Sequence, residues 1–232
     1  MHSFVLVSKD YGPLLRNTAG VREQLERYEQ VVLQLTITGL GGGCIEPHVP
    51  PWTEVAAQLP PLIDWAGDPR RVTVRFDPVV HWREEGVIRS NLPQAAAVFE
   101  AAAAAGVRTV RVSIAQVYAK MRRRGVEWHE PGPAERREIA AHLQELAHAR
   151  GLELYACADP TLVAAGIRPS ACIDGALLAA LHPRRLPLPT RKDPGQRAAC
   201  GCSPSVDIGS YRMRCPHACR YCYAEPNVIS NA

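Results

Sequence analysis

The chain has 232 residues, of which 47% are hydrophobic and 22% are charged. These are ordinary values for a globular protein with a sizeable core, and they argue against disorder along most of the chain. The net charge of +4 permits a nucleic-acid partner without requiring one. No apolar run reaches the roughly 18 residues of a membrane span, and the N-terminus lacks the pattern of a secretory signal peptide. We therefore expect a cytoplasmic protein with no membrane partner.

Strands and helices alternate along the first 160 residues. Short, β-branched apolar runs predict strands buried on both faces, at residues 4–8, 31–38, 72–76, 107–114 and 152–157. Helical spacing predicts helices between them, at residues 21–28, 53–65, 92–105 and 134–150. Gly106 and Gly151 follow the last two helices, where glycine commonly ends a helix before the next strand.

This alternation predicts an α/β fold of parallel strands joined by right-handed crossovers. We expect a partial or incomplete (β/α) barrel of the TIM type over residues 1–182, with an open doubly wound sheet as the alternative. Residues 183–197 are rich in proline and basic side chains, which is typical of an extended connector. We therefore assign residues 183–232 to a connector and a cysteine-rich, iron–sulfur tail that needs a metal or docking on the barrel for order.

Five of the eight cysteines lie in the tail, at Cys200, Cys202, Cys215, Cys219 and Cys222. Clustered thiols without a secretion signal indicate a metal or an iron–sulfur cluster rather than disulfides. The C-x3-C-x2-C spacing of the last three suits three irons of a [4Fe–4S] cluster and leaves the fourth iron open. Cys200 or Cys202 either closes that fourth position or leaves it free, and a tetrahedral zinc site is the alternative.

Polar side chains lie at or just beyond the C-terminal ends of four of the predicted strands. In a (β/α) barrel such positions line the catalytic face, and here they are Thr36, Thr38, Arg75, Asp77, Ser113, Gln116, Cys157 and Asp159. Arg75 and Asp77 either bind a carboxylate or ribose or pair with each other. Asp77 and Asp159 precede prolines, so turn formation or helix capping is the competing interpretation. Cys157 and Cys172 are either small core residues or thiols that face the cluster as ligands or redox groups.

The tail closely resembles an uncharacterised bacterial family, domain-of-unknown-function family eighteen-forty-eight. The resemblance rests on the run from Cys200-Gly-Cys202 to Tyr211 and on the run from Cys215 to Ala224. Thr36-Ile-Thr38-Gly39, Ile45-Glu46-Pro47, Arg75-Phe76-Asp77-Pro78, Cys157 and Cys172-Ile-Asp174 also match. The resemblance implies that a first strand found in most members is missing from this chain.

The same cysteine spacing, with an aromatic residue before its last cysteine, is similar to that of the radical S-adenosylmethionine (SAM) enzymes. This similarity implies that Cys215, Cys219 and Cys222 ligate three irons while SAM binds the fourth. Thr36, Thr38, Arg75, Asp77 and Tyr221 are then candidate cofactor-binding residues, and no catalytic residue is assigned. A ferredoxin or flavodoxin is the implied electron donor, and the substrate is unknown.

Three classes of function follow. The first is an iron–sulfur protein that resembles radical SAM enzymes and cleaves SAM to act on an unknown substrate. The second is a non-catalytic iron–sulfur or zinc module for electron transfer or structure. The third is a nucleic-acid-directed protein that uses the arginines at residues 122–124 and 184–185, although such runs are more often solvated.

Overall fold

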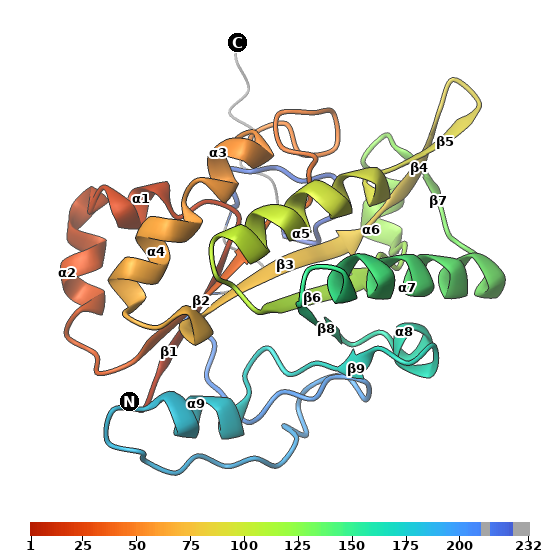
Figure 1. Ribbon diagram of the computed structural model, residues 1–232. Coiled ribbons are helices and arrows are strands. Elements are labelled where there is room, and N and C mark those ends of the chain that lie inside the picture. The colour runs from red at the N-terminus through yellow and green to blue at the C-terminus, as the bar shows by residue number, and fades with distance from the viewer. Residues whose placement is uncertain (210–213, 225–232) are drawn as a thin grey trace.

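The structure is a computed structural model that describes residues 1–209 and 214–224. Its centre is a six-stranded sheet whose spatial order, β1-β2-β3-β6-β8-β9, follows the order of the strands in the chain (Figure 1). Every neighbouring pair in this sheet is parallel. The strands are β1 (Phe4–Ser8), β2 (Val31–Thr36), β3 (Val72–Val79), β6 (Thr109–Ile114), β8 (Glu153–Ala156) and β9 (Arg168–Pro169).

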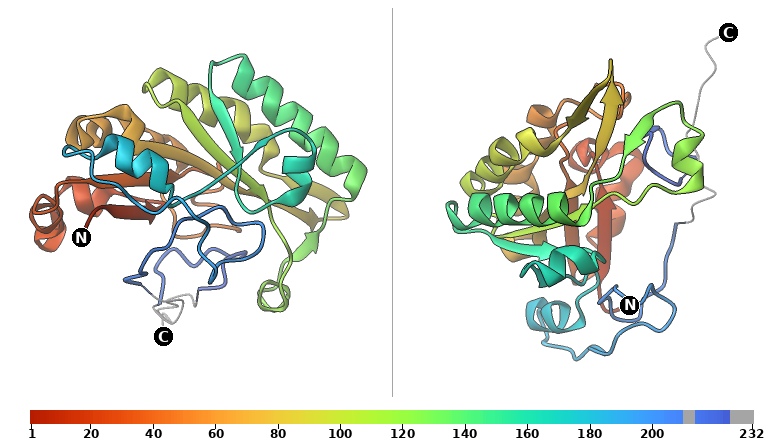
Figure 2. Two further views of the ribbon diagram at one scale, coloured as in Figure 1. Left: turned by 90° about the horizontal axis from the view of Figure 1, so that it is seen from below. Right: turned by 90° about the vertical axis from the view of Figure 1, so that its right-hand side faces the viewer.

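The principal helices cover one face of this sheet. Right-handed crossovers between sequential parallel strands place all connecting helices on the same side. Figures 1 and 2 show this side occupied by α4 (Leu59–Ala66), α5 (Ala95–Ala104) and α7 (Pro133–His148), with the C-terminal segment on the opposite face. We call that opposite face the polar face of the sheet.

Residues alternate between the two faces along each strand. On β3, Val74 and Phe76 are fully buried in the main apolar core, and the intervening Arg75 belongs to the polar face. The same alternation on β6 buries Val110 and Val112 in that core and directs Arg111 to the polar face, since successive strand side chains point to opposite sides. The strands β3 and β6 are therefore apolar towards the helices and carry arginines on the polar face.

The α/β class and the parallel strands predicted from the sequence are confirmed. The order of the strands does not reverse, as it would in a doubly wound sheet. Within residues 1–209 and 214–224, β1 and β9 form the two edges of the sheet and do not pair with each other. The described strands thus form an open, singly wound sheet rather than a closed TIM barrel.

The predicted elements occur with changed boundaries. The helix predicted at residues 53–65 is two helices, α3 (Trp52–Ala56) and α4, because Pro60 and Pro61 lie in the first turn of α4, where the missing amide hydrogens cost nothing. The helix predicted from residue 92 begins with a 3₁₀ turn, Leu92–Gln94, before α5. The helix predicted at residues 21–28 is the shorter α2 (Val21–Leu25).

A second, antiparallel sheet was not predicted. It has the order β5-β4-β7 and is built from β4 (His81–Glu84), β5 (Val87–Ser90) and β7 (Glu127–His129). The β4–β5 turn, Glu85-Gly86, has positive φ at both residues, as a two-residue hairpin turn requires. Further short helices are α1 (Gly12–Leu15), α6 (Ala119–Arg122), α8 (Pro160–Ala164) and α9 (Gly175–Leu181), with 3₁₀ turns at Thr18–Gly20 and Pro69–Arg71.

Backbone hydrogen bonds connect the segment after α9 to itself and to the loop after β9. Asp193 N donates to Cys202 O at 2.8 Å within the segment, and Ser203 N donates to Ile173 O at 2.8 Å in the loop. The domain boundary expected at residue 183 stays a prediction. In the part of the chain that the structure describes, no helix is long and apolar enough to cross a membrane.

Candidate functional site

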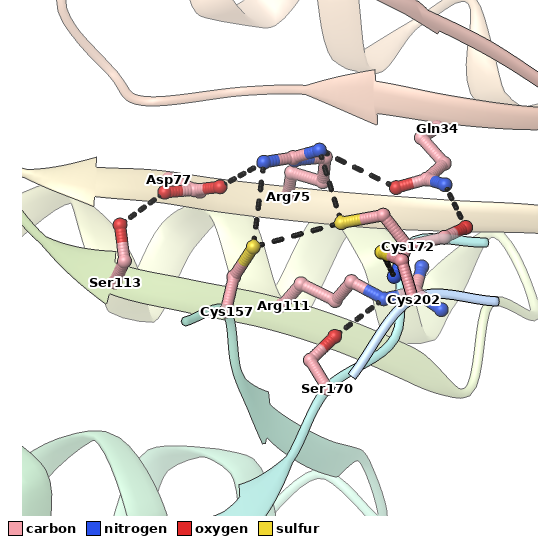
Figure 3. Close-up of polar contacts among 9 residues, drawn as sticks. All are labelled: Gln34, Arg75, Asp77, Arg111, Ser113, Cys157, Ser170, Cys172 and Cys202. Carbon is pink, nitrogen blue, oxygen red and sulfur yellow. Dashed lines mark hydrogen bonds and ion pairs between the residues drawn. The ribbon is translucent and has the colours of Figure 1, made fainter. Parts of the chain in front are cut away.

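Arg75 lies at the centre of a polar cluster on the polar face (Figure 3). Its Nη2 forms an ion pair with Asp77, and its Nη1 lies 3.5 Å from Gln34 Oε1. The same guanidinium donates towards the Sγ atoms of Cys172, at 3.4 Å, and Cys157, at 3.9 Å. Burial alone would lower the pKa of Arg75, but Asp77 and the two thiols more than offset it, so that pKa lies above its ordinary value.

Asp77 is held from both sides. Its Oδ2 faces Arg75, and its Oδ1 accepts a hydrogen bond from the hydroxyl of Ser113. These contacts join the ends of β3 and β6. Arg75 and Asp77 form the internal ion pair that was one of the two interpretations. Both side chains also line a cavity, and ligand binding there stays a prediction.

Three cysteines meet beside Arg75. The Sγ atoms of Cys157 and Cys172 are 3.5 Å apart. Cys202 Sγ accepts the backbone N–H groups of Cys172, at 3.2 Å, and Ile173, at 3.4 Å. Hydrogen bonds from Cys157 and Cys202 lower the pKa of the Cys172 thiol, with help from the nearby guanidiniums, whereas the hydrogen bond to Cys172 and burial raise the pKa of Cys157.

Arg111 fixes the segment that carries Cys172. Its Nε donates to Ser170 Oγ at 2.9 Å, and its Nη2 donates to Ala171 O at 3.1 Å. Arg111 is 5% exposed, and burial lowers its pKa. A buried guanidinium with two defined acceptors sets the position of the loop after β9.

A cavity of about 350 Å³ opens at the carboxyl ends of β3, β6 and β8. Ligands of open parallel sheets bind outside the carboxyl ends of the strands. Side chains from these strand ends and from the cysteine-rich segment line this cavity, among them Asp77, Ser113, Gln116, Cys157, Tyr221 and Cys222. The second predicted strand-end acid, Asp159, also lines the cavity, and it accepts the N–H groups of Thr161 and Leu162 and so caps α8.

The segment Cys215–Cys222, which we call the cysteine loop, contributes Tyr221 and Cys222 to the wall of this cavity. Cys219 and Tyr221 are buried in a second apolar cluster with Ile45 and Met121. Arg220 N donates to Ile45 O at 2.9 Å, and Arg124 Nη1 donates to Cys219 O at 2.7 Å. The loop is thus seated between the segment after β2 and the segment around α6.

Glu46 holds the cysteine loop in this position through a buried hydrogen bond with Tyr221. It is 1% exposed and accepts hydrogen bonds from Thr38 Oγ1 at 2.6 Å, from Lys9 Nζ at 2.9 Å and from the Tyr221 hydroxyl. Burial and the adjacent Glu46 carboxylate raise the pKa of Tyr221. In the sequence, Glu46 stood out only as part of a motif that matches the family, and its role as a buried acceptor was not predicted. A single acid inside an apolar, glycine-rich loop was the available signal.

The glycines before Glu46 serve this packing. A Cβ on Gly41 would lie 2.0 Å from Pro50 O, and one on Gly39 would lie 2.4 Å from Gln94 Cβ. Thr36 and Thr38 line a void of about 10 Å³ beside them, at the lower limit for one water molecule. These two predicted cofactor-binding residues therefore lie beside the cysteine loop and do not line the cavity at the strand ends.

The predicted metal ligands lie in two groups. Cys215, Cys219 and Cys222 share the cysteine loop, and burial raises the pKa of Cys219 to about 12, with contributions from Glu46 and the other two thiols. Cys202 lies with Cys172, and Cys200 N donates to Arg197 O. Across residues 1–209 and 214–224, no three histidine, cysteine or acidic side chains are grouped as a metal ion would require.

The basic runs make contacts within the chain. Arg122 pairs with Glu130 at 3.2 Å and Arg184 pairs with Glu29 at 2.7 Å. Arg185 donates to Ala180 O at 2.7 Å. These arginines have local roles at the surface, and Arg124 has a defined role in holding the cysteine loop.

Fold and site together define a class: an α/β protein with an open parallel sheet, polar strand ends and a cysteine-rich C-terminal loop seated beside them. Residues 1–224 match the family described as Domain of unknown function (DUF1848), and the chain belongs to that family. The family resemblance inferred from the motifs is thereby confirmed, although Tyr211, which was part of it, lies outside the described residues. No curated protein and no solved structure matches the chain.

Proposed function

We propose that this chain is an iron–sulfur protein of the radical SAM type, with a [4Fe–4S] cluster held by Cys215, Cys219 and Cys222. The observation that carries the proposal is the shared wall of the cavity. Cys222 and Tyr221 line it from one side, while Asp77 and Ser113 line it from the ends of two strands. A cluster on the cysteine loop would therefore adjoin a space of about 350 Å³.

The donor set of the cysteine loop fits such a cluster. Three thiols lie within one segment of the chain, and Cys215 and Cys222 are close enough to contribute to the raised pKa of Cys219. Buried thiols resist ionisation, as the raised pKa of Cys219 reflects, and iron binding offsets that cost because the ligand is the thiolate. Since the thiols are not grouped around one point, binding includes a change in their side-chain torsions.

The chain's own residues would then bind and orient a second ligand in the cavity. A reduced cluster of this type supplies the electron that cleaves SAM. Arg75 and Asp77 provide charged groups on the cavity wall, and Gln116 provides an amide. Arg75 Nε is buried and has no partner among the described residues, which leaves one donor for a ligand or water.

The position of Cys202 supports an open fourth iron. Cys202 is buried beside Cys172, where its sulfur accepts two backbone hydrogen bonds, and among the described residues it is not grouped with the thiols of the cysteine loop. The alternative, a closed iron–sulfur or zinc module for electron transfer or structure, is the outcome to be tested against this proposal.

The sheet suits the proposal as part of a (β/α) barrel. Its strands run in chain order with helices α4, α5 and α7 on one face, which is the arrangement of one section of such a barrel. We further propose a cytoplasmic protein that receives electrons from a ferredoxin or flavodoxin, because clustered thiols require a reducing compartment. The substrate is not assigned, and the zinc and nucleic-acid alternatives are included in the tests.

The first test is metal analysis of protein purified without oxygen. We expect about four irons and four sulfides per chain and an electron paramagnetic resonance signal after reduction. Cys219→Ser should lose most of the iron. Cys44→Ser, which changes an exposed thiol, is the matched control and should keep it. Stoichiometric zinc without sulfide would overturn the cluster.

The second test separates the open from the closed cluster. SAM should alter the signal of the reduced protein, and 5′-deoxyadenosine should form. Cys200→Ala and Cys202→Ala should each keep the [4Fe–4S] signal. A signal that SAM does not change, together with cluster loss in one of these variants, would support the closed module instead. Tight nucleic-acid binding with a steep salt dependence would support the third class.

A further inference from the structure

Cys157 and Cys172 form a close thiol pair outside the cysteine loop. Their Sγ atoms are 3.5 Å apart, and a disulfide requires about 2.05 Å. Both side chains are half-buried. Rotation of the two side chains over about 1.5 Å would bring the sulfurs to bonding distance.

The backbone brings these cysteines together from adjacent strands. Cys157 directly follows β8, and Cys172 lies shortly after β9, which pairs with β8. Ser170 N donates to Ala156 O at 2.9 Å, and Arg111 holds Ser170 and Ala171. The positions of both cysteines are thus fixed by contacts of the protein itself.

The thiol pair has a neighbouring cation, Arg75, and a route of access, the cavity. The Arg75 guanidinium donates to Cys172 Sγ at 3.4 Å and lies 3.9 Å from Cys157 Sγ. A guanidinium beside a thiol favours the thiolate, which is the nucleophile in disulfide exchange. Cys157 lines the cavity, so a small disulfide entering there would reach Cys157, and the Cys172 sulfur lies 3.5 Å from the Cys157 sulfur.

We propose that Cys157 and Cys172 are a redox-active dithiol that exchanges with small disulfides admitted through the cavity. Figure 3 shows the two sulfurs facing each other beneath Arg75. Neither cysteine belongs to the cysteine loop, so the proposal does not require the iron–sulfur cluster, although it shares Arg75 and the cavity with the proposed function.

The chemistry balances without a further reagent. The sulfur of Cys157, which lines the cavity, attacks one sulfur of a small disulfide and forms a mixed disulfide. The other half leaves as a thiolate and takes up the proton of the Cys157 thiol. The Cys172 thiolate then attacks the Cys157 sulfur, forms the Cys157–Cys172 bond and expels the second half. Two protein thiols are oxidised and one small disulfide is reduced to two thiols.

The test is equilibration of the full chain, without oxygen, in buffers of rising oxidised-to-reduced glutathione ratio. Free thiols are then blocked with iodoacetamide, and disulfides are reduced and labelled with a second reagent. Both cysteines lie within residues 151–184, which trypsin releases as one peptide because Arg168 precedes Pro169. We expect both sites to change label together, at one midpoint.

Single variants make the mechanism falsifiable. Cys172→Ser should trap Cys157 as a mixed disulfide with glutathione, whereas the exposed Cys44 should require more oxidising buffers. Circular dichroism checks that the variant folds. If the variant does not fold, the titration of the wild-type protein still tests the proposal. Independent labelling of Cys157 and Cys172, or pairing of Cys172 with Cys202, would overturn the proposal. Loss of iron from the cysteine loop would not affect it, because the readout is specific to the peptide.

Discussion

The hydroxyl of Tyr221 donates a hydrogen bond to Glu46, a carboxylate that lies 175 residues earlier in the chain. Both side chains are buried. Because Glu46 also accepts hydrogen bonds from Lys9 and Thr38, this one carboxylate connects the cysteine loop to the segments that follow β1 and β2. The position of the cysteine loop therefore depends on a polar contact inside an apolar cluster.

Tyr221→Phe should lower the free energy of unfolding by about 1.5–3 kcal/mol, since a hydrogen bond to a charged acceptor is lost. Urea unfolding at pH 7 measures this change. Tyr118→Phe is the matched control, because its hydroxyl bonds Gln116 at the surface, and it should change stability by about 0.5 kcal/mol or less. Equal losses in the two variants would contradict the role of Glu46 as a buried anchor.

Glu46→Ala should be more damaging than Tyr221→Phe. It leaves the Lys9 ammonium without its partner at a largely buried position, and removing one member of a buried ion pair costs about 3–5 kcal/mol. Urea unfolding gives the size of the loss. The double variant Lys9→Met/Glu46→Ala should recover part of it, whereas a loss equal to the sum of the two single changes would argue against coupling.

Arg124→Ala should loosen the cysteine loop. Arg124 donates to Cys219 O at 2.7 Å and to Ala224 O at 2.6 Å, so its removal leaves these carbonyl groups without that donor. Hydrogen exchange followed by mass spectrometry should show faster exchange in residues 215–224. Arg123→Ala, at the exposed neighbouring position, should leave that exchange unchanged.

The Arg75–Asp77 pair should behave as one unit. Asp77→Ala leaves a guanidinium with only 16% side-chain exposure, and we expect a loss of about 3 kcal/mol or more. Arg75→Met/Asp77→Ala should be more stable than Asp77→Ala alone. A double-mutant cycle measured by urea unfolding gives the coupling free energy, and additive single effects would show that the two residues act separately.

Acid should weaken the protein through His81. Burial lowers the pKa of His81, with Glu135 opposing this and His129 and Arg136 adding to it. A histidine with a lowered pKa takes up its proton more readily when unfolded, so stability falls as the pH decreases below the ordinary histidine pKa and towards the folded value. Urea midpoints at pH 7 and pH 5 should differ more in the wild type than in His81→Leu. An unchanged pH dependence in the variant would assign the effect to other groups.

The sequence allowed the fold to be predicted where one strand or helix carries its own pattern. Apolar runs such as 72–76 and 107–114 are buried against helices whichever neighbours they meet, so the parallel α/β class follows from local periodicity. The β4–β5 hairpin was missed because its strands are short and its turn is Glu85-Gly86, a weaker signal than the usual asparagine or aspartate before glycine.

The sequence by itself determined the family, the parallel sheet and the spacing of Cys215, Cys219 and Cys222, because these are encoded in neighbouring residues. Only the tertiary structure decided that Glu46 meets Tyr221 and that Cys202 lies with Cys172 rather than beside the cysteine loop. The same is true of the Cys157–Cys172 contact. These partners are separated by 15 to 175 residues. Which of them meet depends on how the strands order themselves and on which buried polar groups find partners, and spacing along the chain does not contain that information.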